Sequence, residues 1–228
     1  MTGSLAAFQS DLAGALAGEI ACPIDTTSAG YRLTLKIRRS WCEGRVIVGS
    51  RRILSAIPAT ERQRLLTEYV DRGGGLEMFL HREAETFMAF LVPRLPEPSH
   101  ALTLCQMHQA LTRARRGAEI GAQSRPDIAD RMVERGRYAS LVWFYADPGE
   151  VVAGLTTGAS LPRIGVAKHA VLFAPRLPDC FRIATAAEAE LWAALPMADA
   201  PPALMAPLLS EGVIQYADAG EPSDCRAG

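Results

Sequence analysis

Apolar residues recur at helical spacing through much of the N-terminal half of the chain. Such stripes predict one helix over residues 76–92 and another that begins after Ser99, a residue able to cap a helix. A third helix is predicted from the capping box of Thr60 and Gln63, and it should end at the glycines of positions 73–75. This half of the chain is therefore expected to be mainly helical.

Alternation of apolar and polar residues predicts a strand before these helices. In residues 31–38 every second side chain is apolar, which is typical of a half-buried strand. The apolar positions of residues 41–57 fit a helix as well as a broken pair of strands, so that segment is left open.

A hairpin is predicted in the middle of the chain. Residues 141–146 and 151–156 are apolar runs, and Asp147-Pro148-Gly149 joins them. Proline presets the backbone of a turn and glycine permits a positive φ, so this tripeptide favours a turn between two strands.

The C-terminal part alternates strands and helices. Residues 164–174 are apolar and rich in β-branched side chains, which predicts a strand, and the capping box of Thr185 and Glu188 begins a helix. A second short helix, which Pro207 should kink or split, leads to a strand over residues 213–216. The order strand, helix, helix, strand is the outline of a small winged-helix-like module.

These elements predict an α+β fold in two parts. Shorter apolar stripes add helices over residues 5–18 and 126–135. We expect a mainly helical N-terminal domain over 1–136, a β-rich peptide-recognition module over 138–217 and a frayed tail over 218–228.

Composition and charge exclude several classes of protein. The 228 residues are 49% hydrophobic and carry a net charge of −1, so a core is affordable and nucleic acid is not an expected partner. No apolar run approaches the ~20 residues of a membrane span, and no secretory signal is present, so a cytoplasmic protein without a membrane partner is expected. The five cysteines lack CxxC spacing, which argues against a disulfide framework or structural zinc.

Candidate chemistry is sparse, because no hydrolase, kinase or dehydrogenase signature occurs. His81 and Glu85 share a helix face, but that face should be solvated. Glu83 falls on the apolar stripe, where a buried carboxylate needs a partner, and an arginine is expected. Cys105 and His108 lie one turn apart and are expected to be core residues; as an alternative, Glu83, Cys105 and His108 between the central helices could serve a metal- or cofactor-binding enzyme.

A winged-helix outline serves either DNA recognition or peptide capture. The helix over 185–195 contains Glu188 and Glu190 without Lys or Arg, the wrong sign for phosphate contacts. Peptide capture, by adding a strand to an open sheet edge, is therefore favoured, along residues 164–173 or 141–145. The candidate peptide-binding residues are Ile164, Val166, Lys168, Ala170, Leu172, Leu141, Trp143 and Tyr145.

One family resemblance narrows this hypothesis. The run HAVLFAPRLPDCFRIATAAEAELWAAL, followed by APPALMAPLLSEGVI, resembles the C-terminal part of accessory proteins paired with multinuclear non-heme iron oxidases in ribosomal-peptide natural-product pathways. The runs GYRLTLKIRRSW, LLTEYV and LEMFLHREAETFMAFL are similar to the partner proteins of methanobactin cassettes.

The resemblance implies a subunit that is not itself the catalyst. Its peptide-recognition module (a RiPP recognition element) would hold the leader of a ribosomally made precursor peptide. It would present a Cys-containing core to an iron-dependent oxygenase in a heterodimer, for post-translational modification. No cofactor is expected in this chain, and iron is expected in the partner enzyme.

Overall fold

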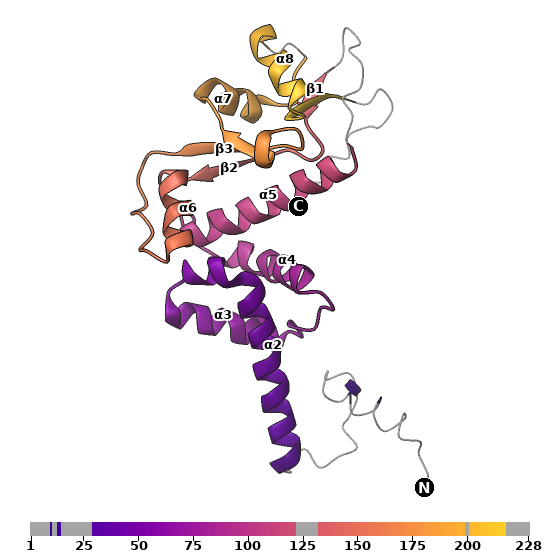
Figure 1. Ribbon diagram of the computed structural model, residues 1–228, viewed down its shortest axis with the longest axis vertical. Coiled ribbons are helices and arrows are strands. Elements are labelled where there is room, and N and C mark those ends of the chain that lie inside the picture. Colours follow the sequence, from indigo (N-terminus) through magenta and orange to yellow (C-terminus); the bar gives the residue numbers. More distant parts are fainter. Residues whose placement is uncertain (1–9, 11–12, 15–28, 122–131, 199–200, 218–228) are drawn as a thin grey trace. The chain divides into compact units, whose positions relative to one another are not determined.

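A computed structural model describes residues 10, 13–14, 29–121, 132–198 and 201–217 (Figure 1). The chain forms two compact units, residues 1–94 and residues 95–228. The domain boundary inferred from sequence, at residues 136–138, falls inside the second unit. The α+β class is confirmed: the described part of the first unit is helical, and the second contains small antiparallel sheets.

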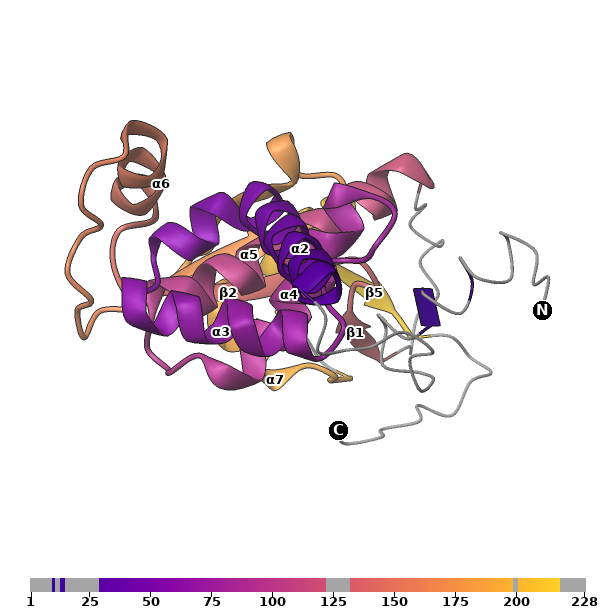
Figure 2. The ribbon, with the colours of Figure 1, turned by 90° about the horizontal axis from the view of Figure 1, so that it is seen from below.

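Three helices and a short 3-10 turn make up the described part of the first unit. They are α2 (Ala29–Ser55), α3 (Ala59–Asp71), α4 (Leu80–Leu91) and η1 (Val92–Arg94). Figure 2 shows α3 and α4 beside α2, and α2 contacts both. The buried side chains at the centre of this unit include Val46, Ile53, Leu65, Phe87 and Leu91.

The strand predicted over residues 31–38 is wrong, because these residues belong to α2. Leu33 and Ile37, which the alternation assigned to a buried face, are 58% and 60% exposed. Burial in α2 follows helical spacing instead, through Cys42 and Val46. Residues 41–57, where the sequence pattern fits a helix as well as strands, are helical up to Ser55. The helix is interrupted at Ser50, where φ is −121°.

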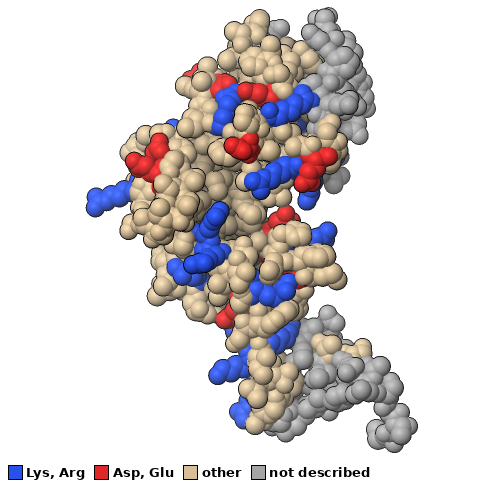
Figure 3. Space-filling model, in the orientation of Figure 1, with Lys and Arg blue, Asp and Glu red and all other residues tan. Residues whose placement is uncertain are grey.

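Positive charge is concentrated on α2. The helix carries seven Lys or Arg residues, and Glu43 is its one acidic residue; Figure 3 shows several blue side chains along it. Arg39 pairs with Glu43 and with Asp71 of α3, at 3.2 and 3.1 Å.

The ends of α3 and α4 differ partly from the predictions. The capping box at Thr60 is wrong: α3 begins at Ala59 after Pro58, without a side-chain cap. Its end at the glycines is confirmed, since Gly73 follows with a φ of +89°. The helix α4 begins at Leu80, later than predicted, because the residues before it form a loop around Glu83, described below.

The second unit combines helices with two small sheets. Its helices are α5 (His100–Glu119), α6 (Pro148–Thr157), α7 (Ala186–Ala194) and α8 (Pro202–Ser210), with the turn η2 (Pro178–Cys180). One sheet pairs β1 (Val133–Arg135) with β5 (Ile214–Tyr216). The other has the order β2-β3-β4, from β2 (Ser140–Phe144), β3 (His169–Phe173) and β4 (Phe181–Ile183).

Two of the predicted helix caps in this unit are confirmed. The hydroxyl of Ser99 accepts from the amide of Leu102 at the start of α5. Thr185 and Glu188 form the capping box of α7. The order β4, α7, α8, β5 is also as predicted, although β4 and β5 lie in different sheets. Pro207 sits inside α8 without ending it.

The hairpin predicted around residues 147–149 is wrong, because α6 begins there. Asp147 caps the helix by accepting from the amide of Glu150 at 3.0 Å, and Pro148 occupies the first turn. Aspartate followed by proline is also a helix-start signal, since the first turn does not need the amide that proline lacks.

One apolar core joins the C-terminal strands and helices. It includes Leu172 of β3, Leu191 of α7, Leu208 of α8 and Ile214 of β5, all buried. Leu141 of β2 packs against this cluster.

Some predicted elements fall on residues outside the described ranges. The helix over 5–18, the segment 126–131 and the tail 218–228 lie almost entirely outside the described residues. Residues 133–135, predicted as the end of a helix, form β1. Among the described residues, no helix is long and apolar enough to span a bilayer.

Candidate functional site

A groove of about 260 Å³ lies between α5 and β2 in the second unit. Its walls combine one side of a long helix with an edge strand of the three-stranded sheet. The lining residues are Glu97, Leu102, Thr103, Gln106, Gln109, Ala110, Arg113, Ser140, Leu141, Val142, Trp143 and Tyr145.

The ladder of the sheet fixes the direction of each backbone group of β2. Ala170 of β3 accepts from the amide of Ala184, so its carbonyl points toward β4. Backbone groups alternate sides along an antiparallel strand, so Val171 of β3 points toward β2 and bonds its partner Val142. Leu141 and Trp143 of β2 therefore direct their N–H and C=O groups to the outer edge, into the groove.

Some of these outward groups already have partners. The hydroxyl of Thr103 donates to the carbonyl of Trp143 at 3.2 Å, and the amide of Gly165 donates to the carbonyl of Tyr145 at 2.7 Å. The N–H and C=O of Leu141 and the N–H of Trp143 make no hydrogen bond with the described residues. The edge of β2 thus keeps two donors and one acceptor for another chain.

The helical wall of the groove is mostly polar. Gln106, Gln109 and Arg113 follow one another at intervals of three and four residues, so they share one side of α5. The Gln side chains are half-buried and Arg113 is exposed. An extended backbone with polar side chains could find hydrogen-bond partners along this wall.

The two ends of the groove differ in charge. At the β2 N-terminal end, Nη1 of Arg113 donates to the hydroxyl of Ser140 at 3.3 Å. At the opposite end, the hydroxyl of Tyr145 donates to Oε1 of Glu97 at 2.6 Å, and this bond raises the pKa of Tyr145. The groove is therefore cationic at one end and anionic at the other.

The sequence-predicted peptide-binding residues divide into two groups. Leu141, Trp143 and Tyr145 all line the groove. The other candidate edge, residues 164–173, is not an edge: its strand begins only at His169, and β3 pairs with strands on both sides. The prediction of one long strand over residues 164–174 is wrong for the first residues of the run, because these remain in solvent. Val166, for example, is 99% exposed.

The remaining candidates of that run lie in two places. Ala170 and Leu172 are buried in the central strand β3. Ile164, Val166 and Lys168 precede β3, and Nζ of Lys168 lies 5.4 Å from the centre of the Tyr145 ring. Ala170 and Leu172 thus reach the groove only as the β3 partners of Trp143 and Leu141, and Lys168 reaches it through Tyr145.

Sequence analysis missed the helical wall of the groove. Thr103, Gln106 and Gln109 carry no sequence signature of a binding site, because polar residues on a helix are usually solvated. Arg113 lies near the C-terminus of a predicted helix. A cation is favourable at that end of a helix, so its presence there does not by itself indicate a binding role. The available signal was their common spacing on the side of α5 next to its apolar face.

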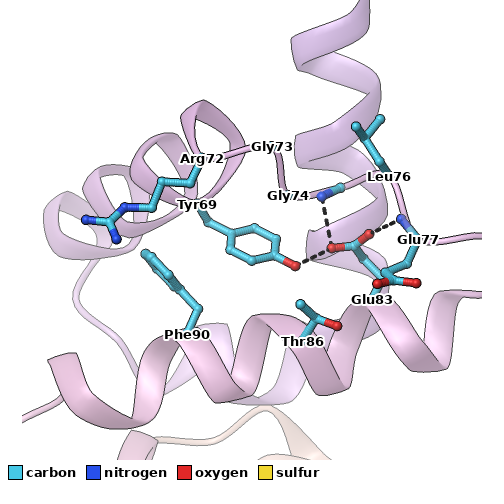
Figure 4. A pocket seen from close by; sticks show the side chains of 10 residues that line it. Tyr69, Arg72, Gly73, Gly74, Leu76, Glu77, Glu83, Thr86 and Phe90 are labelled. Atoms are coloured by element: carbon cyan, nitrogen blue, oxygen red, sulfur yellow. Dashed lines mark hydrogen bonds between the residues drawn. The ribbon is translucent and has the colours of Figure 1, made fainter. Parts of the chain in front are cut away.

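A second cavity, of about 360 Å³, lies in the first unit beside Glu83 (Figure 4). The carboxylate of Glu83 is fully buried and accepts from the hydroxyl of Tyr69 at 2.6 Å and from the amides of Gly75 and Glu77, each at 2.9 Å. Burial was predicted correctly, but the expected arginine partner is replaced by these three donors. Burial and the neighbouring carboxylate raise the pKa of Tyr69.

The three residues of the alternative metal site are divided between the two units. Glu83 belongs to the first unit, and Cys105 and His108 belong to α5 in the second. Burial raises the pKa of the Cys105 thiol to about 12. No group of three or more His, Cys, Asp or Glu side chains placed to hold a metal ion occurs in the described ranges.

Comparisons with protein-family models, with curated proteins and with solved structures find no match to this chain.

Proposed function

We propose that this chain is a peptide-binding subunit that captures an extended peptide as an added strand on the outer edge of β2. The observation that carries the proposal is the set of outward backbone groups at Leu141 and Trp143, which face the groove beside α5. Main-chain pairing would supply affinity, and the side chains of the groove would supply selectivity.

The finer part of the proposal concerns the identity of the peptide and the partner. The peptide is the leader of a ribosomally made precursor whose Cys-containing core is modified by an iron-dependent oxygenase bound to this subunit. This part is supported by the resemblance of residues 169–195 and 200–214 to accessory proteins of such oxidases. The chain itself performs no chemistry in this proposal.

Peptide capture is tested with a ribosome-displayed library of random twelve-residue peptides selected on the full chain. The affinity of an enriched peptide is then compared between the protein and its Leu141→Pro variant, which lacks one outward donor. We expect at least a tenfold loss of affinity, since the pyrrolidine ring also blocks the edge. Leu141→Ala keeps the donor and controls for the lost side chain.

Ile183→Pro supplies a matched control on the opposite edge of the same sheet. The amide of Ala184 donates to Ala170 of β3, so the alternation of backbone groups directs the amide of Ile183 away from β3; the side chain of Ile183 is 61% exposed. Ile183→Pro should leave peptide affinity unchanged. Equal binding by the protein and Leu141→Pro, or no enriched peptide at all, would show that β2 does not capture a strand.

The proposed complex with an iron-dependent oxygenase is tested separately, by co-expressing the chain with a candidate enzyme of that kind. The two should co-purify, and only the complex should modify a Cys-containing precursor peptide. Turnover by the isolated chain, after metal removal and repletion, would contradict the proposal.

A further inference from the structure

We infer that the groove selects peptides with a carboxylate side chain at one defined position, the position opposite Ser140, through Arg113. This inference rests on the proposed peptide capture and adds the chemical class of the peptide that is captured. It also fixes the register of that peptide on β2.

The alternation of side chains along β2 defines the position. The hydroxyl of Ser140 meets Arg113 of α5, so the side of β2 that carries Ser140 faces this helix. The next residue, Leu141, packs on the opposite side, against the core cluster with α7 and α8. Directly paired residues of neighbouring strands point to the same side of a sheet. A peptide residue opposite Ser140 must therefore point toward α5.

The side chain at that position meets a guanidinium that has no acidic partner in the part of the chain that the structure describes. Arg113 is exposed and makes no ion pair with the described residues. Its guanidinium donates a hydrogen bond to the neutral hydroxyl of Ser140. A carboxylate can accept two parallel hydrogen bonds from a guanidinium, which a neutral side chain cannot match in strength. An Asp or Glu residue is thus the side chain that completes this end of the groove.

The rest of the groove disfavours a second acidic side chain in the bound peptide. The next peptide position that points toward α5 lies opposite Val142, where the wall offers the neutral amides of Gln106 and Gln109. The far end is lined by Glu97, which would repel a second carboxylate, whereas Lys168, near the ring of Tyr145, does not line the groove. The charges therefore favour one acid at the Ser140 end over acids spread along the peptide.

The test uses the same random twelve-residue library, now selected in parallel on the protein, on Arg113→Glu and on Arg116→Glu. We expect Asp or Glu to be enriched at a single position of peptides from the protein, and Lys or Arg at the same position for Arg113→Glu. Arg116 is exposed on α5 but does not line the groove, so Arg116→Glu should keep the acidic preference.

One enriched peptide then gives the magnitude. Replacing its acid by the matching amide should weaken binding to the protein about tenfold at low salt, and the loss should shrink as salt is added. Binding to Arg113→Gln should be insensitive to that replacement. The folded state of each variant is checked by its thermal unfolding.

The outcomes separate the inference from the proposed function. Peptides that depend on the edge of β2, as shown by Leu141→Pro, but carry no acidic preference would overturn the role of Arg113 and leave peptide capture in place. An acidic preference that survives Arg113→Glu would overturn the inference in the same way. Failure to enrich any peptide would overturn both.

Discussion

The hydroxyl of Tyr69 donates a hydrogen bond of 2.6 Å to the carboxylate of Glu83, and both side chains are buried in the first unit. Tyr69 lies near the end of α3 and Glu83 in the first turn of α4. The amides of Gly75 and Glu77 donate to the same carboxylate, so one charge organises the connection between two helices.

Removing this carboxylate should destabilise the first unit. Glu83→Ala leaves three donors, two of them buried, without an acceptor, and we expect the free energy of unfolding to fall by about 2–3 kcal/mol, measured by urea denaturation. Tyr69→Phe removes one of the three bonds and should cost about 1–2 kcal/mol. Glu85→Ala, on the same helix, is the control and should change stability by less than about 0.5 kcal/mol. A Glu83→Ala variant as stable as the protein would contradict this account.

The glycines of the same connection should differ in tolerance. Gly73 and Gly75 both have positive φ, at +89° and +88°, so alanine strains the backbone at either position by about 1–2 kcal/mol. An added Cβ at Gly73 meets open space, whereas at Gly75 it would collide with Cys42 of α2. Gly75→Ala should therefore be the more destabilising variant by a further 1–3 kcal/mol or so. Similar unfolding midpoints for the two variants would refute the predicted collision.

The ion pair of Arg182 and Glu188 should make the second unit acid-sensitive. The guanidinium bonds both oxygens of the carboxylate, at 2.6 and 2.9 Å, and lowers the pKa of Glu188 to about 2. A carboxyl whose pKa is lower in the folded state stabilises it above the unfolded pKa, and that contribution is lost as pH falls toward the folded value.

The measurement compares the protein with Glu188→Gln at several pH values. The difference in unfolding free energy should be largest above about pH 5, on the order of 2 kcal/mol after solvent screening, and should shrink toward pH 2. Glu190→Gln, an exposed neighbour on α7, should show no such trend. A difference that stays constant with pH would mean that the ion pair is not its source.

The start of α6 offers a test of its capping residue. Asp147→Ala removes the acceptor for the amide of Glu150 and should lower stability by about 1 kcal/mol. Asp147→Ser retains a capping oxygen and should recover most of this loss in thermal unfolding. If both variants lost the same stability, the capping bond would not be the cause.

Local chemistry made part of the fold predictable from sequence. Ser99 and Thr185 mark helix starts because a cap needs only a few neighbouring residues, and both caps are present. The failures came where two local signals compete or where tertiary packing decides. Asp147-Pro148 serves a turn or a helix start equally well, and alternation in residues 31–38 does not indicate a strand when three of its four apolar side chains remain exposed.

The candidate site was less predictable than the fold. Leu141 and Trp143 could be proposed from an apolar run, but their outward backbone groups follow from the pairing of β3 with β4, which no local pattern contains. Arg113 is placed at the groove by its contact with Ser140, across 27 residues of chain, which no local pattern reveals. Glu83 was expected to pair with an arginine because amide donors carry no sequence signature.

The burial of Cys105 in the helix that walls the groove has a consequence for thiol chemistry. The thiolate is the species that attacks disulfides and electrophiles, and burial raises the pKa of the Cys105 thiol far above neutral pH, so the unreactive thiol form prevails. Cys42, in the first unit, is also buried, and burial raises its pKa too. If the proposed function holds, Cys105 would therefore not form mixed disulfides with a cysteine-bearing precursor peptide, and the sulfur of that peptide would stay available for modification.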